Sequence, residues 1–164
     1  MVGRMTPGKG HEEFLNAAKL IINKSKVPTR FLIVGSASYG EELYEKKIRS
    51  LASKLMLNNV IIFTGFRKDI PRILNAVDIL AFPSHEESFG VTLLEAMAME
   101  IPVVASNTAG VPDIVTNGKT GILIPPKNPI ALANALIGLA ENSELRMKLG
   151  KEGRRRVENF FNID

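Results

Sequence analysis

The sequence contains no cysteine and no tryptophan, and its apolar runs are far shorter than the roughly 18 residues that a membrane-spanning helix requires. The absence of cysteine excludes disulfide bonds and thiolate metal sites. Also missing are a His, Asp and Glu cluster at metal-ligand spacing, a P-loop, a Gly-x-Ser-x-Gly elbow and a full Gly-x-Gly-x-x-Gly fingerprint. We therefore expect neither a metal ion nor another cofactor, and a cytoplasmic location is compatible with these absences.

Charged residues make up 23% of the chain, an ordinary share for a globular protein, and neither sign is in large excess. The 164 residues carry a net charge of +4, a mild basic excess. This excess fits an anionic small ligand or an anionic membrane surface, but it is too weak to indicate nucleic acid binding. The basic run 154–156 has no aromatic platform beside it, so we interpret it as the solvated face of a helix.

Short β-rich apolar runs alternate with longer amphipathic ones, a pattern typical of a parallel sheet covered by helices. The expected strands are residues 30–34, 60–64, 78–82, 103–106 and 121–124. The expected helices are residues 10–24, 39–56, 70–76, 90–99 and 112–117, followed by one that begins at Pro129 and one with Ser143 as N-cap. The pattern predicts an α/β fold with a Rossmann-like, doubly wound parallel sheet.

The same pattern predicts which side chains are buried. Strands that are apolar nearly throughout, such as residues 31–34 and 79–82, should be buried on both faces. His11 is expected to be an exposed residue in the first turn of its helix. The helix at 39–56 is expected to bury one apolar face, made of Leu43, Ile48, Leu51, Ala52 and Leu55.

The N-terminus has the pattern of a shortened strand. Gly3 and Arg4 are typical of the turn after a strand, yet only Met1 and Val2 precede them, whereas a strand usually has about five residues. We expect residues 1–164 to form a single domain that is a fragment of a longer protein.

Two glutamates flank an aromatic-glycine turn in the middle of the chain. Glu87 precedes Phe89 and Gly90, and Glu95 lies on the apolar helix that follows. The start of a helix is electropositive and carries unpaired backbone N–H groups, so it binds anions. A phosphate at this helix start would have a carboxylate on either side, each able to accept hydrogen bonds from hydroxyl groups. Either glutamate alone is well explained as a solvated acid, but the pair suits a sugar nucleotide.

This tract, residues 82–98, resembles the Glu-x7-Glu motif of the retaining glycosyltransferases of family 4, which have the GT-B fold. The resemblance implies that Glu95 accepts hydrogen bonds from the ribose hydroxyls and that Glu87 contacts the donor sugar. It also implies that the backbone of Phe89 and Gly90 reaches the sugar and the diphosphate. Glycine at this position lets backbone N–H groups approach a phosphate closely. The ring of Phe89 is expected to belong to the core.

The segment from Gly3 to Gly10 carries the second part of the resemblance. Its glycines and proline predict a turn, in which solvated cations would be ordinary. In the family, two cations of this segment hold the donor diphosphate, which assigns that role to Arg4 and Lys9, with Gly3 in the same loop. Each fixed cation could stabilise the departing diphosphate by up to a few kcal/mol at an effective dielectric constant of about 20.

Loops after the other strands complete the predicted site. In open α/β sheets, ligands bind beyond the carboxyl ends of the strands, where Gly35 lies. The resemblance places Phe66 and Arg67, which follow the next strand, against the nucleobase through main-chain groups. Gly110 belongs to a segment that resembles the family's Gly-x-Pro-Glu-Ile-Val and is expected to face the donor. Asp113 stands where the family more often has glutamate, and we interpret it as a helix-start acid.

The resemblance covers residues 3 to about 161 and implies the C-terminal, donor-binding half of a GT-B enzyme. The full-length enzyme would transfer a hexose-type sugar from a UDP-, GDP- or ADP-linked donor with retention of configuration, by front-face attack of an acceptor hydroxyl. Its partners would be that donor and its own N-terminal acceptor domain, which is absent here. Peripheral membrane association of the full-length enzyme is compatible with the charge, and nucleic acid is not expected.

Two alternatives have the same fold. One is a non-catalytic nucleotide-binding domain, which would have no use for the full set of Arg4, Lys9, Glu87 and Glu95. The other is a GT-B enzyme of different chemistry, such as a sugar-nucleotide epimerase or a relative of glycogen phosphorylase. The Glu-x7-Glu spacing favours a transferase over an epimerase, and no lysine is marked out as a pyridoxal phosphate site.

Overall fold

The computed structural model describes residues 1–87 and 89–161, so Ser88 of the glutamate tract lies outside the described residues. The strands are β1 (Phe31–Val34), β2 (Ile61–Gly65), β3 (Leu80–Phe82), β4 (Val103–Ser106) and β5 (Ile122–Ile124). The helices are α1 (His11–Lys24), α2 (Glu42–Lys54), α3 (Ile70–Leu74), α4 (Val91–Ala98), α5 (Val111–Ile114), α6 (Pro129–Glu141) and α7 (Ser143–Phe160). Within the described residues, none of these helices combines the length and the apolar character that crossing a bilayer requires.

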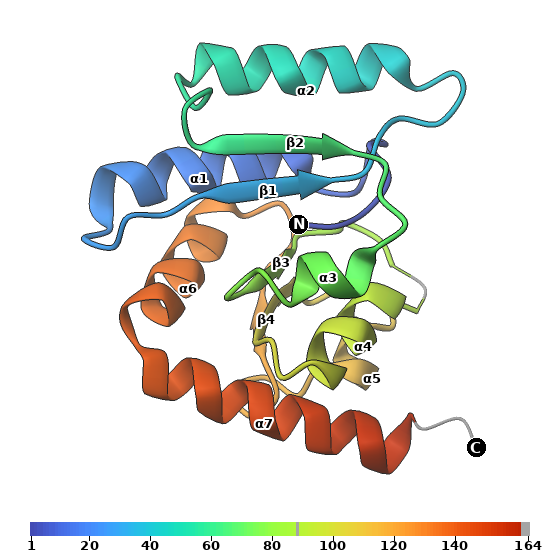
Figure 1. The fold of residues 1–164 in the computed structure, drawn as a ribbon, viewed down its shortest axis with the longest axis vertical. Coiled ribbons are helices and arrows are strands. Elements are labelled where there is room, and N and C mark those ends of the chain that lie inside the picture. Colours follow the sequence, from blue (N-terminus) through green and yellow to red (C-terminus); the bar gives the residue numbers. More distant parts are fainter. Residues whose placement is uncertain (88, 162–164) are drawn as a thin grey trace.

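All paired strands are parallel and alternate with helices, which confirms the predicted α/β fold. The strands form two sheets, β1-β2 and β3-β4-β5, and no ladder among the described residues joins β1 to β3. The N-terminus lies between these two strands (Figure 1), where Val2 forms an isolated parallel bridge with Val34. The predicted doubly wound sheet is therefore divided at the place of the short N-terminal segment.

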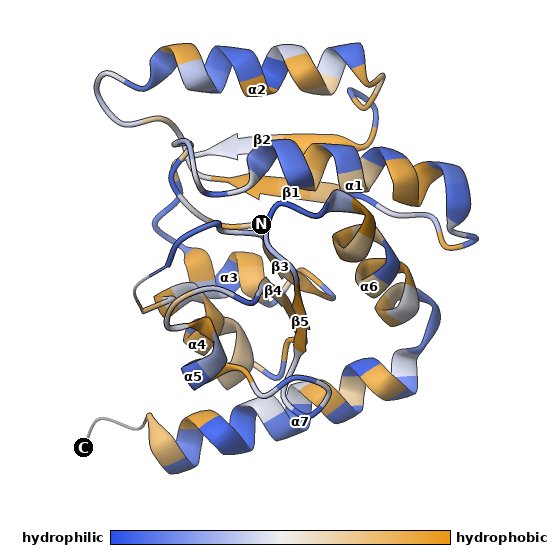
Figure 2. Cartoon of the chain, turned by 180° about the vertical axis from the view of Figure 1, so that it is seen from behind, coloured by the Kyte–Doolittle hydropathy of each residue, from blue (hydrophilic) through white to orange (hydrophobic). Residues whose placement is uncertain are grey.

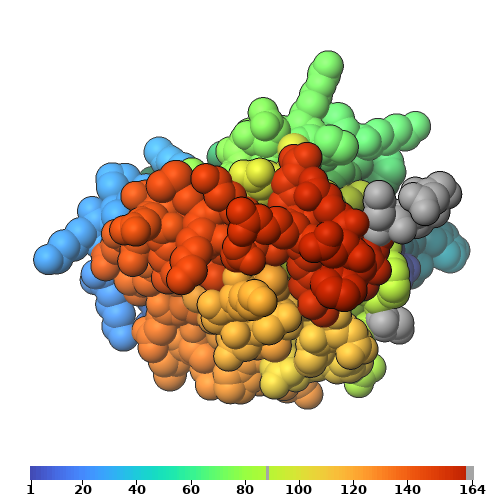
Figure 3. Space-filling model, turned by 90° about the horizontal axis from the view of Figure 1, so that it is seen from below, coloured from blue at the N-terminus to red at the C-terminus, as the bar shows by residue number. Residues whose placement is uncertain are grey.

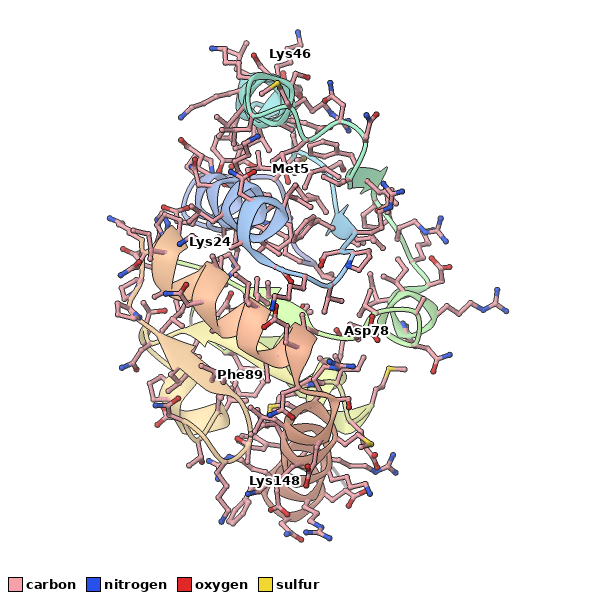
Figure 4. All side chains as sticks on the ribbon, turned by 90° about the vertical axis from the view of Figure 1, so that its left-hand side faces the viewer. Met5, Lys24, Lys46, Asp78, Phe89 and Lys148 are labelled. Carbon is pink, nitrogen blue, oxygen red and sulfur yellow. The ribbon has the colours of Figure 1, made fainter. Side chains whose placement is uncertain are left out.

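Side chains of the strands alternate between two apolar cores. Ala81 and Val104 belong to the core built with α1, α2 and α6, whereas Leu80 and Val103 belong to the core built with α4 and α5. Successive side chains of a strand point to opposite faces, so the two cores lie on opposite sides of the strands. Strands β3 and β4 are consequently buried on both faces, as predicted for the run that contains β3, and are strongly hydrophobic in Figure 2. In β1, the other run predicted to be buried on both faces, Leu32 is only partly buried. Met5, labelled in Figure 4, is fully buried in the first core.

The buried face of α2 differs from the prediction at one residue. Ile48 and Ala52 are buried as expected, but Leu43 is 79% exposed. With 3.6 residues per turn, Leu43 lies about 140° around the helix from Ile48, whereas Tyr44 lies about one turn before it. Tyr44 packs against this core in place of Leu43.

Two predictions at helix starts are also wrong. His11 has no exposed surface, because the first turn of α1 packs under α2 and the His11 ring lies edge-on to the ring of Tyr44, with centroids 5.8 Å apart. The N-cap of α7 is Asn142 and not Ser143, since the Asn142 side chain accepts a hydrogen bond from the backbone N–H of Leu145 at 2.9 Å.

Helix α7 covers one end of the molecule and lies over the segment that contains α5 (Figure 3). Arg154 and Arg155 each pair with a glutamate of α7 itself, as expected for a solvated helix face. Arg156 departs from that prediction. Its guanidinium donates hydrogen bonds to the carbonyl oxygens of Ile114 at 2.6 Å and Asp113 at 2.7 Å, at the C-terminal end of α5. The third arginine therefore joins two helices.

Candidate functional site

A pocket of about 300 Å³ opens between the N-terminal loop and the start of α4. Its lining consists of Val2, Gly3, Arg4, Lys9, Phe82, Glu87, Phe89, Gly90, Val91 and Thr92. The structure thus brings together both predicted cations, the first glutamate of the Glu-x7-Glu tract and the aromatic-glycine turn. These groups come from three places in the fold: the loop before α1, the loop after β3 and the first turn of α4.

An ion pair joins the two sequence motifs at this pocket. Lys9 Nζ donates a hydrogen bond to Glu87 Oε2 at 2.7 Å, and the two side chains are 27% and 17% exposed. Burial alone would raise the pKa of Glu87. The hydrogen bond and charge of Lys9, together with backbone N–H groups of Gly90 and Phe89, outweigh burial and hold this pKa below its usual value. Glu87 is therefore ionised at neutral pH and fixed in position.

Gly90 connects this carboxylate to the start of α4. Its backbone N–H donates to Glu87 Oε1 at 3.3 Å, and its left-handed φ of 64° and ψ of 47° are readily adopted by glycine. The next two residues, Val91 and Thr92, begin the helix and line the pocket. The positive end of the α4 dipole therefore faces the pocket, and an anion bound there would be stabilised.

Close backbone contacts hold the N-terminal loop in place. A Cβ atom on Gly10 would overlap the carbonyl oxygen of Pro83, and one on Gly35 would overlap the carbonyl oxygen of Gly3. The backbone N–H of His85 also donates to the carbonyl oxygen of Gly8 at 2.7 Å. These contacts fix the loop that carries Arg4 and Lys9 against the ends of β1 and β3. Arg4 itself is exposed at the pocket.

The remaining predicted residues lie outside the pocket lining. Glu95 is exposed on α4, one and a half turns beyond Gly90, and partial burial raises the pKa of its carboxyl group. Phe66 is 71% exposed after β2, and Arg67 forms a bidentate ion pair with Asp69 at 2.6 and 2.8 Å. These three residues could meet only parts of a ligand that extend beyond the pocket.

Two glycines lie at the edge of the site through backbone contacts. Gly35 adjoins Gly3, and its backbone N–H donates to the carbonyl oxygen of Gly65 at 2.9 Å. Gly110 donates its backbone N–H to the carbonyl oxygen of Glu87 at 3.3 Å. Its φ is −74°, a conformation that residues other than glycine also adopt. Both glycines therefore support residues of the pocket.

Some features of the site were missed at the sequence level. The ring of Phe89 is 57% exposed at the pocket, so the expectation that it belongs to the core is wrong. Val2, Phe82 and Thr92 also line the pocket; Thr92 could have been found as a polar residue in the first turn of α4. Among the described residues, no group of three or more His, Asp or Glu side chains is arranged to hold a metal ion.

The family model described as glycosyl transferases group 1 matches residues 1–156. Among the curated relatives, the D-inositol 3-phosphate glycosyltransferase of Corynebacterium efficiens is 34% identical over 162 residues, which cover 97% of this chain and 38% of that protein. The capsular polysaccharide biosynthesis glycosyltransferase CapM of Staphylococcus aureus is 31% identical over 160 residues, covering 98% and 41%. The chain thus spans about two fifths of the length of these relatives.

Solved structures show the same fold. The C-terminal domain of the glycosyl transferase group 1 family protein LpcC from Francisella tularensis superposes with a TM-score of 0.90 at 31% identity, covering 99% of this chain and 84% of that one. HepE of Anabaena in complex with UDP-glucose gives a TM-score of 0.90 at 29% identity, covering 97% and 43%. These neighbours are GT-B glycosyltransferase domains, which confirms the predicted fold.

Proposed function

The chain belongs to the glycosyl transferases group 1 family, and from this premise we propose that it is the donor-binding domain of a retaining glycosyltransferase of family 4. The full enzyme would transfer a hexose-type sugar from a nucleoside diphosphate to an acceptor hydroxyl. The carboxylate of Glu87, held between Lys9 and the N-terminus of α4 beside the pocket, carries this proposal. A cation, a carboxylate and a helix start at one pocket suit a ligand that has both phosphate and hydroxyl groups.

The pocket residues have distinct roles in this proposal. Arg4 and Lys9 neutralise the diphosphate together with the positive end of α4. Glu87 accepts hydrogen bonds from hydroxyl groups of the donor sugar, while the backbone of Phe89 and Gly90 approaches the sugar and the diphosphate.

The nucleoside would extend from the pocket toward the remaining predicted residues. Glu95 accepts hydrogen bonds from the two ribose hydroxyls, and main-chain groups of Phe66 and Arg67 meet the base. Gly35 and Gly110 lie at strand ends, where ligands of open α/β sheets bind, and in this proposal their backbones border the donor. The exposure of Glu95 on the same helix as the pocket supports its role, because a partner hydroxyl can reach it.

The reaction in this proposal needs no protein nucleophile. The bond between the anomeric carbon and the diphosphate oxygen breaks, and its electron pair stays on the diphosphate. The acceptor oxygen forms its bond on the same face of the sugar, and its proton passes to the departing diphosphate. Arg4 and Lys9 supply positive charge where negative charge develops, so we expect no metal or cofactor.

Two similar proteins support uridine diphosphate as the first donor to test. HepE of Anabaena was solved with UDP and with UDP-glucose. A relative from Escherichia coli that is 34% identical over 164 residues is named as a UDP-Gal-dependent galactosyltransferase. We propose that the full enzyme combines this domain with an N-terminal acceptor domain and acts in the cytoplasm, in solution or at a membrane surface.

Calorimetric titration of the chain with UDP, GDP and ADP tests the proposal. We expect saturable binding of at least one nucleotide, with a dissociation constant between about 10 μM and 1 mM. Glu95→Ala should weaken binding about tenfold, because charge-assisted hydrogen bonds to the ribose are lost. Glu144→Ala, an exposed acid in the first turn of α7, is the control and should leave the affinity unchanged.

Absence of binding to all three nucleotides would refute the donor site. Binding of a nucleotide without measurable binding of its sugar conjugates would favour the alternative of a non-catalytic nucleotide-binding domain. A preference among the three nucleotides would identify the base.

A further inference from the structure

The loop between β1 and α2, residues 35–41, lies against the N-terminal segment, and we call it the support loop. A Cβ atom on Gly35 would overlap the carbonyl oxygen of Gly3. Next to this contact, the backbone N–H of Met5 donates to the carbonyl oxygen of Ser36 at 2.9 Å. The support loop therefore touches the N-terminal segment at two places that are only two residues apart.

Thr6 joins the two pocket cations to this support. Its backbone N–H donates to the carbonyl oxygen of Arg4 at 3.1 Å, and its own carbonyl oxygen accepts from the backbone N–H of Lys9 at 3.4 Å. Its side chain reaches the support loop, because Thr6 Oγ1 donates a hydrogen bond to Glu41 Oε1. A movement of Thr6 would therefore shift both Arg4 and Lys9.

The side chain of Glu41 does little for the helix that it begins. Glu41 is the N-cap residue of α2, yet its side chain makes no capping hydrogen bond, and glutamate is not one of the favoured N-caps. Its second oxygen, Oε2, is buried and has no hydrogen-bond partner among residues 1–87 and 89–161. A buried carboxyl oxygen without a partner costs free energy. Stability therefore explains this side chain poorly, which points to a role at the site.

The support loop is itself fixed by α2. The backbone N–H of Ala37 donates to Glu45 Oε2 at 2.8 Å, and Arg49 pairs with Glu45 Oε1 at 2.8 Å. The hydrogen bond from Ala37, together with Arg49, outweighs burial and holds the pKa of Glu45 below its usual value. The backbone N–H of Glu41 donates to the carbonyl oxygen of Ser38 at 2.9 Å. Glu41 therefore reaches Thr6 from a loop that is held at several points.

We propose that Glu41 is a positioning residue of the donor site, which acts through Thr6 to hold Arg4 and Lys9 where they meet a diphosphate. This inference rests on the proposed function. Glu41 is not among the described residues that line the pocket, so its effect passes through the N-terminal segment. The attraction between a cation and a phosphate falls with distance, and a misplacement of about 1 Å can weaken a site strongly. Loss of the hydrogen bond between Thr6 and Glu41 should therefore weaken contacts with the diphosphate more than contacts with the nucleoside.

Calorimetric titration with UDP and UMP compares variants of two adjacent glutamates. Glu41→Ala should weaken UDP binding about tenfold and lower the ratio of UDP to UMP affinity at least about threefold, because UMP lacks the second phosphate. Glu41→Gln keeps an oxygen for Thr6 and should bind UDP within about threefold of the wild type. Glu42→Ala removes an exposed neighbour and, as the control, should change neither value. An unchanged affinity ratio in Glu41→Ala would overturn the proposal.

The pKa of Glu87 gives a second readout that needs no nucleotide. When Lys9 moves, its hydrogen bond and charge no longer hold this pKa down, so an NMR titration should show a higher pKa in Glu41→Ala than in the wild type. Thr6→Val removes only the hydroxyl donor and takes the place of Glu41→Ala if that variant does not fold. If the wild type binds no UDP, the donor site is refuted, but a raised pKa of Glu87 still supports the positioning of Lys9 by Glu41. An unchanged pKa of Glu87 in the folded variant contradicts it.

Discussion

At the scale of single residues, the ion pair of Lys9 and Glu87 sets the electrostatics of the pocket. An unpaired Glu87 would repel a phosphate bound beside it, but the pair is neutral as a unit. The ammonium group has three donors, of which one is used by Glu87 Oε2 at 2.7 Å. The others remain able to bind a phosphate. Since both side chains are partly exposed, the pair itself contributes only about 1 kcal/mol to stability or less, and in our proposal its main effect is on ligand binding.

The variant Lys9→Met tests this interpretation. We expect UDP binding to weaken by about tenfold or more, because one cation of the pocket is lost. The pKa of Glu87 should rise, since Lys9 supplies the largest effect that lowers it. Calorimetry measures the first effect and an NMR titration of the Glu87 carboxyl group the second. The variant Lys24→Met removes the same charge at the far end of α1 and should change neither; equal behaviour of the two variants would contradict the prediction.

His11 makes the stability of the fold depend on pH. Burial first, and then the charges of the amino terminus and Lys9, lower its pKa to about 4, and neither ring nitrogen has a hydrogen-bond partner among the described residues. The unfolded chain takes up this proton near pH 6.5, the folded chain only near 4. The free energy of unfolding should therefore fall by at most about 3 kcal/mol as the pH is lowered through this window.

Urea unfolding of the wild type and of His11→Phe at pH 7, 5.5 and 4.5 measures this effect. Phenylalanine keeps a ring beside Tyr44 but cannot take up a proton, so the variant should lose less stability on acidification. The amino terminus, with a pKa lowered to about 5, destabilises in the same direction in both proteins and cancels in the comparison. An identical pH dependence for the two proteins would rule out His11 as its source.

At the scale of elements, the fold brings loops together by close backbone contact, and two glycines allow this to be tested. Gly8 and Gly10 both have positive φ, 87° and 77°, in the loop that carries Lys9. A Cβ on Gly10 would overlap the carbonyl oxygen of Pro83, whereas a Cβ on Gly8 would meet nothing within 4 Å. Alanine at either position would therefore carry a similar conformational strain, but only alanine at position 10 would also overlap Pro83.

We expect Gly10→Ala to destabilise the protein by about 2 kcal/mol more than Gly8→Ala, because only the first must push the loop away from Pro83. The same movement should displace Lys9 and weaken UDP binding. Denaturant unfolding and calorimetry on the two variants provide the comparison. Equal destabilisation would mean that the loop can move without cost, and that its contact with Pro83 does not position the site.

Helix α7 supports the site from a distance through Arg156. The guanidinium of Arg156 donates hydrogen bonds to two carbonyl oxygens at the end of α5 and lies over the rings of Phe160 and Phe161. Gly110, the residue before α5, donates its backbone N–H to the carbonyl oxygen of Glu87. Arg156→Ala should cost about 1.5–3 kcal/mol of unfolding free energy, because it leaves helix carbonyls without a charged donor. The neighbouring Arg155→Ala removes only an exposed ion pair and should cost under about 1 kcal/mol in the same urea titration. A similar loss of unfolding free energy in both variants would contradict the inference that Arg156, unlike Arg155, holds two helices together.

At the scale of the whole molecule, the sequence predicted the fold through local patterns and missed what depends on strand order. Apolar runs such as residues 79–82 are recognisable because a strand buried on both faces needs apolar side chains at every position. The gap between β1 and β3, by contrast, depends on which strands are neighbours. The distance of Phe66 from the pocket also depends on strand order. Phe66 follows β2, and β2 lies on the side of β1 opposite to Val2, which lines the pocket. Glu87 and Lys9 could be predicted to lie at one pocket because both stand in tracts that resemble motifs of a known family.

In the proposed function, the donor and the acceptor bind to two different domains. In our proposal the described pocket supplies contacts for a donor, and the acceptor site belongs to a second domain. The 164-residue chain should therefore bind UDP-glucose, yet release UDP from it no faster than the Lys9→Met variant does, in the presence or absence of sugar acceptors. In a full-length parent enzyme, transfer should appear and Glu87→Gln should lower it by at least about a hundredfold, while Glu86→Gln, an exposed neighbour, should not. UDP release by the 164-residue chain that depends on Glu87 would show instead that the reaction requires no second domain.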